Sequence, residues 1–388
     1  MRIESCRFSF ISPFFSCLNV ASVIKILHYC VTYHVQDTSL TSRERYLSLF
    51  AREKPDRIPT DYWATDEMTS RLLRELRCST VEELYCRLHI DGIVKIDPPR
   101  RTTYHPDDPQ ADIWGVRKKV VNYGPGTYEE FGTHPLATFT TVEEINAFTW
   151  PSPDDIDWGL FKEHLWKAPT HRVIRSSDFE PFLIYCAMRG MELAMMDFLE
   201  SPEIVQAGLD HIFQYYYEVN QQAFEIGKGR IDMTYIAEDL GSQSGLLFGL
   251  DQIRTFILPN QKRMADLARS YGIHIFYHTD GAVRDVIPDL ITVTGIELLN
   301  PIQWRCQSMD RRELVRDFGA QVIFHGAMDN QQTLPFGTVD EVRAEVLENI
   351  SIFSPARWIC APCHNLQPNT PTANVVAMYE TIHEYGQF

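Results

Sequence analysis

The sequence predicts an α/β fold, and more specifically a single-domain (β/α)8 TIM barrel with a β-hairpin inserted after its second strand. The chain has 388 residues, of which 44% are hydrophobic, so it can bury a large core, and α/β barrels often form one domain of about 250 residues or more. From Thr41 onward, short β-rich runs alternate with longer helical patterns, which predicts parallel βα units. Eight such units are the number that closes a barrel.

Eight segments have the composition of buried strands. Several are continuous apolar runs, such as IHIFYH and QVIFHG, as expected for strands that are covered on both faces. Helix-start signals lie between them: Thr338 and Glu341 have the spacing of a capping box, and Ser201 precedes a proline at a predicted first turn. The predicted strands are Ile58–Tyr62, Gly92–Asp97, His171–Arg175, Asp232–Ala237, His274–His278, Gly295–Leu299, Val322–His325 and Trp358–Ala361.

Two segments fall outside this alternation. Residues 1–40 contain an apolar run, interrupted by Pro13 and Lys25, that resembles a poor signal peptide without a convincing cleavage site. We therefore expect a poorly ordered extension, or an upstream translation start, before a barrel at residues 41–388. Ile113–Gly132 alternates with period two around Gly124-Pro125-Gly126, which predicts the β-hairpin. Over the barrel mouth it would be a lid or specificity element, or equally a plain structural hairpin.

Composition excludes several classes of function. The formal net charge of −16 would repel nucleic acid and anionic membranes, so we expect neither as a partner. The nine cysteines show no dense disulfide framework, which favours reduced thiols in a cytoplasmic protein. Neither a phosphate loop nor a GxGxxG motif follows a predicted strand, which disfavours a nucleotide-dependent enzyme.

Polar residues gather where the predicted strands end, and TIM barrels place their chemistry at the C-terminal ends of their strands. A single histidine or carboxylate at such a position is usually a hydrogen-bonded structural residue or a helix cap. Here five consecutive strands end in polar clusters, which would converge on one mouth. The candidate catalytic residues are Asp97, Glu238, Asp239 and His325, and the candidate substrate-binding residues are Gln243, Asn300, Gln303 and Asn365.

The end of the fifth predicted strand is the best candidate for a metal site. His278 and Asp280 are two residues apart, so their side chains point the same way and can hold one ion. His364, or Cys363 beside it, could supply a third ligand from the last strand. Three N, O or S ligands with one open position are typical of catalytic zinc. The alternative is that His278 and Asp280 only hydrogen-bond to each other and to the loop.

One literal motif is set aside. Cys360-Ala-Pro-Cys363-His364 matches the C-x-x-C-H pattern of covalent haem attachment. Cys360 lies inside an apolar strand pattern, and no convincing export signal precedes it, so covalent haem is not expected. The proline-rich turn also disfavours a redox-active cysteine pair.

From Arg43 to the C-terminus, the chain resembles the uroporphyrinogen decarboxylase superfamily. The segments that carry this resemblance are RERYLSLFAREKPDRIP, DIWGVRKKVVNYG, EDLGSQSG, YHTDG, GIELLNPIQ, FHGAMDNQQTLPFGT and APCHNLQPNTP. The resemblance implies one of two activities. The first is decarboxylation of uroporphyrinogen without a cofactor, and the second is zinc-dependent methyl transfer from a methylated corrinoid protein to a thiol.

The chain departs from both family patterns. Where the decarboxylases carry substrate-binding arginines, residues 60–66 (TDYWATD) contain none, which disfavours a tetrapyrrole with eight carboxylates. Asp97 does match the family's substrate-binding aspartate. Where the methyltransferases bind zinc through a His-x-Cys pair and a later Cys, this chain has His278, Asp280 and His364. Such a set would activate a thiol less well, and it suits another metal or a hydroxylated substrate.

Three hypotheses follow. The first is a metal-dependent methyltransferase that uses zinc or another divalent transition metal, with a methylcorrinoid as co-substrate on a corrinoid protein. The second is a cofactor-free decarboxylase or other lyase on a smaller substrate, in which Asp97 stabilises a protonated intermediate. The third is a non-catalytic binding barrel. The resemblance also leaves a homodimer open, because family members often dimerise.

In the first hypothesis the strand-end residues have different roles. The metal ligands are His278, Asp280 and His364. Asp97 would contact the substrate from the opposite wall. The residues that would orient the substrate or move protons are Glu238, Asp239, Asn300 and His325.

Overall fold

Seven parallel strands form one curled sheet in a computed structural model that describes residues 39–122 and 127–388. Most of the predicted N-terminal extension and the turn at residues 124–126 lie outside the described residues. Each strand pairs with the next one along the sheet. In sheet order the strands are β1 (Ile93–Lys95), β4 (Val173–Phe179), β5 (Met233–Ala237), β6 (His274–His278), β7 (Leu298–Asn300), β8 (Ile323–Met328) and β9 (Arg357–Pro362). These seven correspond to the last seven predicted strands.

The first predicted strand, Ile58–Tyr62, is not a strand of the sheet, but it lies between the two edge strands. Cys360 of β9 donates its N–H to the carbonyl of Pro59 at 2.9 Å, and Asp61 donates to the carbonyl of Cys360 at 3.0 Å. On the other side, Gly92 donates to the carbonyl of Thr60 at 3.0 Å, just before β1 begins. Pro59 has no N–H to donate, which limits the ladder that this segment can form.

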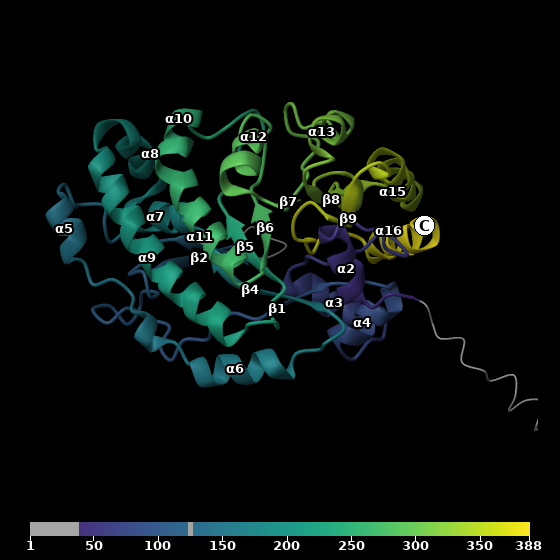
Figure 1. The fold of residues 1–388 in the computed structure, drawn as a ribbon, viewed down its shortest axis with the longest axis horizontal. Coiled ribbons are helices and arrows are strands. Elements are labelled where there is room, and N and C mark those ends of the chain that lie inside the picture. Colours follow the sequence, from purple (N-terminus) through teal and green to yellow (C-terminus); the bar gives the residue numbers. More distant parts are fainter. Residues whose placement is uncertain (1–38, 123–126) are drawn as a thin grey trace, which may run out of the picture. The chain divides into compact units, whose positions relative to one another are not determined.

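The helices that follow the strands lie outside the sheet (Figure 1). Thr338 caps its helix through the predicted capping box, whereas the Ser201 side chain makes no capping hydrogen bond. In chain order the α-helices are α2 (Ser42–Phe50), α3 (Asp66–Glu75), α4 (Val81–Leu88), α5 (Val142–Ala147), α6 (Trp158–Lys167), α7 (Pro181–Arg189), α8 (Met191–Glu200), α9 (Pro202–Ile226), α10 (Leu250–Gln252), α11 (Leu258–Ser270), α12 (Ile287–Asp289), α13 (Arg311–Phe318), α14 (Thr333–Phe336), α15 (Val339–Phe353) and α16 (Thr372–Tyr385).

An apolar layer fills the inside of the sheet toward the N-terminal ends of the strands. Tyr46 and Leu49 of α2 close this end, and the Tyr46 hydroxyl donates to the carbonyl of Thr60 at 3.0 Å. The strands contribute Val173, Met233, Phe276, Leu298, Ile323 and Ile359. Because side chains alternate along a strand, the residue two positions later lies on the same face, nearer the C-terminal end. From β4 to β8 these second-layer residues are Arg175, Tyr235, His278, Asn300 and His325.

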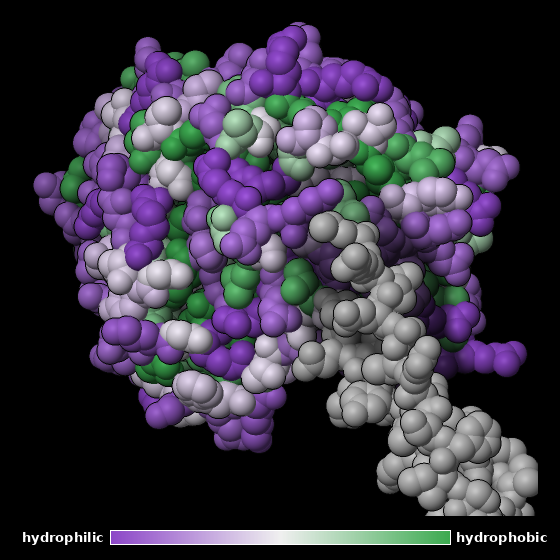
Figure 2. Space-filling view, turned by 45° about the vertical axis from the view of Figure 1, so that its right-hand side comes forward, coloured by the Kyte–Doolittle hydropathy of each residue, from purple (hydrophilic) through white to green (hydrophobic). Residues whose placement is uncertain are grey.

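The remaining strands, β2 (Lys118–Asn122) and β3 (Thr127–Phe131), pair with each other in an antiparallel ladder. They fall within the predicted hairpin, and a role for it as a lid stays a prediction. Hydrophilic side chains cover most of the face drawn in Figure 2, and hydrophobic ones form small scattered groups. Within residues 39–122 and 127–388, no helix combines the length and the apolar character needed to cross a bilayer.

Candidate functional site

A cavity of about 570 Å³ opens at the C-terminal ends of the strands. Four of the predicted site residues line it, namely Asp239, His278, His364 and Asn365. A slightly larger cavity, of about 630 Å³, lies around Leu49, Ile58 and Phe388, toward the other end of the strands. We place the functional site in the smaller cavity, because the histidines and carboxylates gather there.

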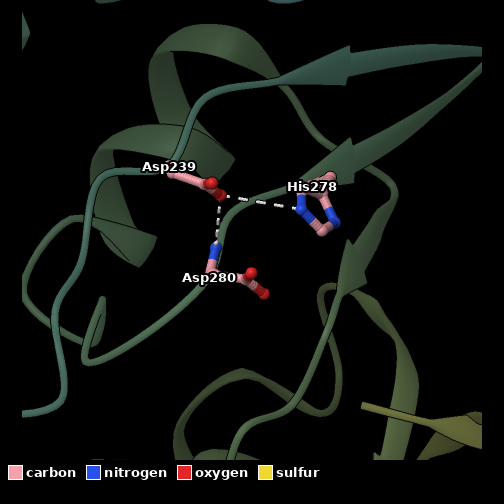
Figure 3. A group of neighbouring side chains, drawn as sticks. All are labelled: Asp239, His278 and Asp280. Atoms are coloured by element: carbon pink, nitrogen blue, oxygen red, sulfur yellow. Dashed lines mark hydrogen bonds and ion pairs between the residues drawn. The ribbon is translucent and has the colours of Figure 1, made fainter. Parts of the chain in front are cut away.

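Asp239 and His278 of this cavity, together with Asp280, form a group that could hold a metal ion, called the metal-ligand group (Figure 3). One potential ligand atom from each residue lies within 4.8 Å of the other two. His278 Nε2 is 3.6 Å from Asp239 Oδ1, and the same oxygen accepts the backbone N–H of Asp280 at 3.1 Å. His364, the third predicted ligand, lies outside this group, although its Nε2 is 3.9 Å from Asp280 Oδ2. Asp239, expected in a catalytic role, belongs to the group, and the ligand role predicted for His364 stays a prediction.

The carboxylate of Asp280 has no hydrogen-bond partner for one of its oxygens. Its Oδ1 is buried and unsatisfied. Burial raises the pKa of Asp280 to about 6, the charge of Asp239 adds to this rise, and His278 opposes it. Among the hydrogen bonds of the described residues, none joins His278 to Asp280. A hydrogen bond between their side chains therefore does not explain why they lie close together. Two close carboxylates with an orphaned oxygen are an arrangement that a cation stabilises.

A chain of hydrogen bonds runs from His278 away from the cavity. The Nδ1 of His278 lies 2.6 Å from Asn300 Oδ1, and the amide nitrogen of Asn300 lies 2.7 Å from His325 Nδ1. The Nε2 of His325 then lies 3.0 Å from Asp61 Oδ2. Asn300 and His325 are completely buried, so each of these polar groups needs a partner inside the protein.

This chain of hydrogen bonds, the relay of His278, Asn300, His325 and Asp61, determines which ring nitrogen of each histidine carries the proton. The Asp61 carboxylate can only accept, so His325 donates through Nε2 and accepts from the Asn300 amide at Nδ1. The Asn300 oxygen then accepts from Nδ1 of His278, which leaves the lone pair of His278 on Nε2. That nitrogen is the one that faces Asp239. The relay therefore holds His278 in the tautomer that a metal ligand requires.

Asp61 is held as firmly as the histidines it orients. Its Oδ2 also accepts the indole N–H of Trp63 at 2.8 Å, and its Oδ1 accepts the N–H of Ile93 at 3.1 Å. Asp61 was not among the predicted site residues, although it lies in the first predicted strand. The signal that could have found Asp61 was its place at the end of the first predicted strand.

Two predicted catalytic carboxylates have structural partners. The Glu238 carboxylate accepts the backbone N–H groups of Phe182 at 2.6 Å and Leu183 at 3.2 Å, at the start of α7. Complete burial raises the pKa of Glu238 well above its ordinary value. Asp97 accepts the N–H of Ser177 at 3.0 Å and lies 3.1 Å from Lys95 Nζ. Neither residue lines the cavity, and their catalytic roles stay predictions.

The predicted substrate-binding glutamines hold loops. Gln303 Oε1 accepts the N–H of Gly281 at 2.7 Å, and so fixes the loop that carries Asp280. Gln243 Oε1 accepts the thiol of Cys306 at 3.4 Å. The alternative ligand Cys363 points elsewhere, because its thiol donates to the carbonyl of Ile302 at 3.1 Å and burial raises its pKa well above the usual range.

The wall formed by β1 and β4 carries charges that the sequence did not indicate. Lys95 is ion-paired with Asp178, and Arg175 lies beside Trp63 and Tyr235. Burial raises the pKa of nearby Glu180 to about 8, and the charge of Asp239 adds to the rise. Asp178 and Glu180 were not predicted because the third predicted strand ended at Arg175, whereas β4 continues to Phe179.

Among solved structures, the fold of this chain is similar to that of a methyltransferase, and two epimerases match it more weakly. The solved structure of a methyltransferase from Methanosarcina mazei has a TM-score of 0.65 at 16% sequence identity, and the match covers 89% of this chain and 99% of that chain. An L-ribulose 3-epimerase has a TM-score of 0.41 at 11% identity, covering 85% and 94% of the two chains. An E. coli 3-keto-D-glucoside 4-epimerase has a TM-score of 0.35 at 9% identity, covering 63% and 84%.

The family assignment comes from the sequence match. The search of curated proteins gave no significant match. The family model of uroporphyrinogen decarboxylase (URO-D) matches residues 179–385, which is more than half of the chain. This range includes the metal-ligand group and most of the relay. The chain belongs to the uroporphyrinogen decarboxylase family.

Proposed function

We propose that the chain is a metal-dependent methyltransferase that works with a corrinoid protein. The observation that carries the proposal is the relay, which directs the Nε2 lone pair of His278 toward Asp239 and Asp280. A structural relative that covers nearly the whole of this chain bears the name methyltransferase. In the fold proposed here, residues 58–62 complete the barrel as its eighth member.

The donor set fits a divalent cation. Asp239, His278 and Asp280 supply two oxygens and one nitrogen, which suit zinc and other divalent transition metals. The unsatisfied Oδ1 of Asp280 would gain a partner. His364, whose pKa is lowered by burial, is close enough to Asp280 to approach the same ion in its neutral form.

In this proposal the residues of the site have different roles. Asp239, His278 and Asp280 hold the ion, while Asn300 and His325 fix the orientation of His278. A metal bound here would act as a Lewis acid that stabilises the anionic form of a substrate thiol or hydroxyl near neutral pH. Asn365 lines the cavity and is available to orient the substrate.

The test is metal content by elemental mass spectrometry, together with demethylation of methylcobalamin in the presence of thiol or alcohol acceptors. We expect near-stoichiometric metal in the wild type and its loss in His278→Ala. The matched control is His274→Ala, at the other end of the same strand, where His274 bonds Glu297 at 2.9 Å outside the site. Absence of metal from the reconstituted wild type, or no methyl loss from methylcobalamin, would contradict the proposal.

Cofactor-free decarboxylation is the second candidate. The observation that favours it is the half-buried carboxylate of Asp97, which lies beside Lys95 and whose pKa is raised by burial and by the charge of Asp178. Lys95, which lines the cavity, connects Asp97 with the substrate space. Decarboxylase activity that survives complete chelation and is lost in Asp97→Asn would favour this candidate over methyl transfer.

A further inference from the structure

Arg175 is a cation in the cavity that has no anionic partner in the described chain. It lies in β4 and lines the same cavity as His278. Within residues 39–122 and 127–388, no carboxylate lies within 4.0 Å of its guanidinium, and its buried Nε has no hydrogen-bond partner. Arg172, three residues earlier, is ion-paired with Glu82 at 2.8 Å. Of these two arginines, the one that lines the cavity is the one without a carboxylate partner among the described residues.

Three aromatic rings surround the guanidinium of Arg175. Its Cζ lies 4.2 Å from the ring centroid of Tyr235, 5.4 Å from that of Phe276 and 5.8 Å from that of Trp63. Ring faces attract a cation, but they cannot accept the five N–H groups that a guanidinium presents. The rings therefore hold the side chain in place and leave its hydrogen-bond donors available.

We infer that Arg175 forms a subsite for a small organic molecule with a carboxylate group, which it would bind through two parallel hydrogen bonds. A planar carboxylate matches the geometry of the guanidinium fork. The other cation that lines this part of the cavity, Lys95, is already engaged by Asp97 and Asp178. Arg175 is therefore the residue positioned to select a negatively charged group.

The position of the subsite indicates how such a molecule would lie. Trp63 and Tyr235 each contact both Arg175 and His278: their ring centroids are 5.8 Å and 5.5 Å from that of the His278 imidazole. A flat or short molecule could contact these rings with its carboxylate on Arg175 and its other end at the metal-ligand group. The identification of this molecule as the substrate rests on the proposed function, whereas carboxylate binding does not.

The test uses benzoate as the probe and benzamide as its neutral counterpart, with binding to the full chain measured by titration calorimetry. We expect benzoate to bind more tightly than benzamide, and Arg175→Met to weaken benzoate binding by about 10- to 100-fold without changing metal content. Arg175→Lys, which keeps the charge but loses the fork, should weaken it to a smaller extent. The control is Arg263→Met, because Arg263 stacks on Phe213 at 4.2 Å outside the cavity.

Chelation separates the subsite from the metal. After the protein is treated with a chelator, the wild type should still bind benzoate more tightly than Arg175→Met does. This result is expected whether or not the methyl-transfer proposal holds. Equal binding of benzoate and benzamide would overturn the inference. So would benzoate binding that is lost on chelation but retained in Arg175→Met, since the metal would then be the carboxylate's partner. If Arg175→Met does not fold, unchanged benzoate binding by Arg175→Lys would overturn the role of the guanidinium fork.

Discussion

The two sides of the cavity differ in charge, in burial and in hydrogen bonding. On the side of β6 to β8, His278 lines the cavity and Asn300 and His325 lie behind it in one relay, in which all three side chains are almost completely buried. On the wall of β1 and β4, Lys95 and Arg175 are charged and partly exposed to the cavity. A buried, fully bonded relay fixes one geometry, which suits a metal ligand. Exposed charges with incomplete pairing suit a substrate that enters and leaves.

The largest effect should come from breaking the relay without removing a ligand. His325→Phe keeps a ring of similar shape but removes both hydrogen bonds of His325. We expect metal affinity to fall by about 10- to 100-fold, as is usual when the partner of a ligating histidine is lost. The buried Asn300 amide would lose the acceptor of its N–H, and Asp61 Oδ2 would keep only the Trp63 indole N–H, which should also lower the free energy of unfolding by about 1–3 kcal/mol. Competition with a chromogenic chelator and urea unfolding measure the two effects.

The control for this variant is His274→Phe, at the start of β6. His274 stacks on Phe50, with ring centroids 4.0 Å apart, and bonds Glu297 far from the cavity. Its replacement should leave metal affinity unchanged. If His325→Phe lowered stability but not metal affinity, the relay would be structural only, and the contrast between the two walls would lose its functional meaning.

An intermediate effect should come from the charged wall. Asp178→Asn removes a negative charge from the cavity and removes one of the two ion pairs of Lys95, while the pair with Asp97 remains. If Arg175 binds a carboxylate, benzoate affinity should rise by about two- to tenfold, because this charge opposes an anion at short, partly screened range. Metal content should not change. Titration calorimetry with benzoate and elemental analysis measure the two quantities.

A surface carboxylate provides the matched control. Asp289 accepts a hydrogen bond from Arg254 at 2.9 Å outside the cavity, so Asp289→Asn should leave benzoate affinity unchanged. Weaker benzoate binding by Asp178→Asn would show that the ion pair positions Lys95, and that this matters more than the charge removed.

The relay wall was largely predictable from the sequence, whereas the charged wall was not. His278, Asn300 and His325 each follow an apolar strand residue by two positions, so strand period and the parallel order of the strands together place them at the same end of the sheet. On β4 the same rule applies to Arg175, but that strand changes register between Arg175 and Asp178. Ser177 there has a φ of 71°. Such an irregularity changes the direction of the side chains that follow it, and the amino-acid composition of the strand does not reveal it.

Contacts between distant segments explain the other differences. Asp239 and His364 were both recognised as strand-end residues, but which of them completes the metal-ligand group depends on loop paths of a few ångströms. The pairing of Asp61 with His325 joins residues 264 positions apart. No local pattern encodes that pairing, since it arises only when residues 58–62 lie between β9 and β1.

The smallest effect should come from the loop that carries Asp280. Gln303→Ala removes the acceptor of the Gly281 N–H, while the loop keeps the bond from Asp280 to Asp239 and the 2.7 Å bond from Ala282 to Ser242. Because these contacts remain, metal affinity should fall by less than about tenfold, at or below the lower limit for outer-shell changes.

Gln243→Ala is the control for the loop, since the Gln243 side chain bonds Cys306 and not the residues next to Asp280. It should leave metal affinity within error of the wild type, as measured by the same chelator competition. A fall in Gln303→Ala as large as that in His325→Phe would mean that the position of the loop, and not the tautomer of His278, controls metal binding. The fixed wall would then extend from the strands into the loop after β6, and the relay would be only one of its supports.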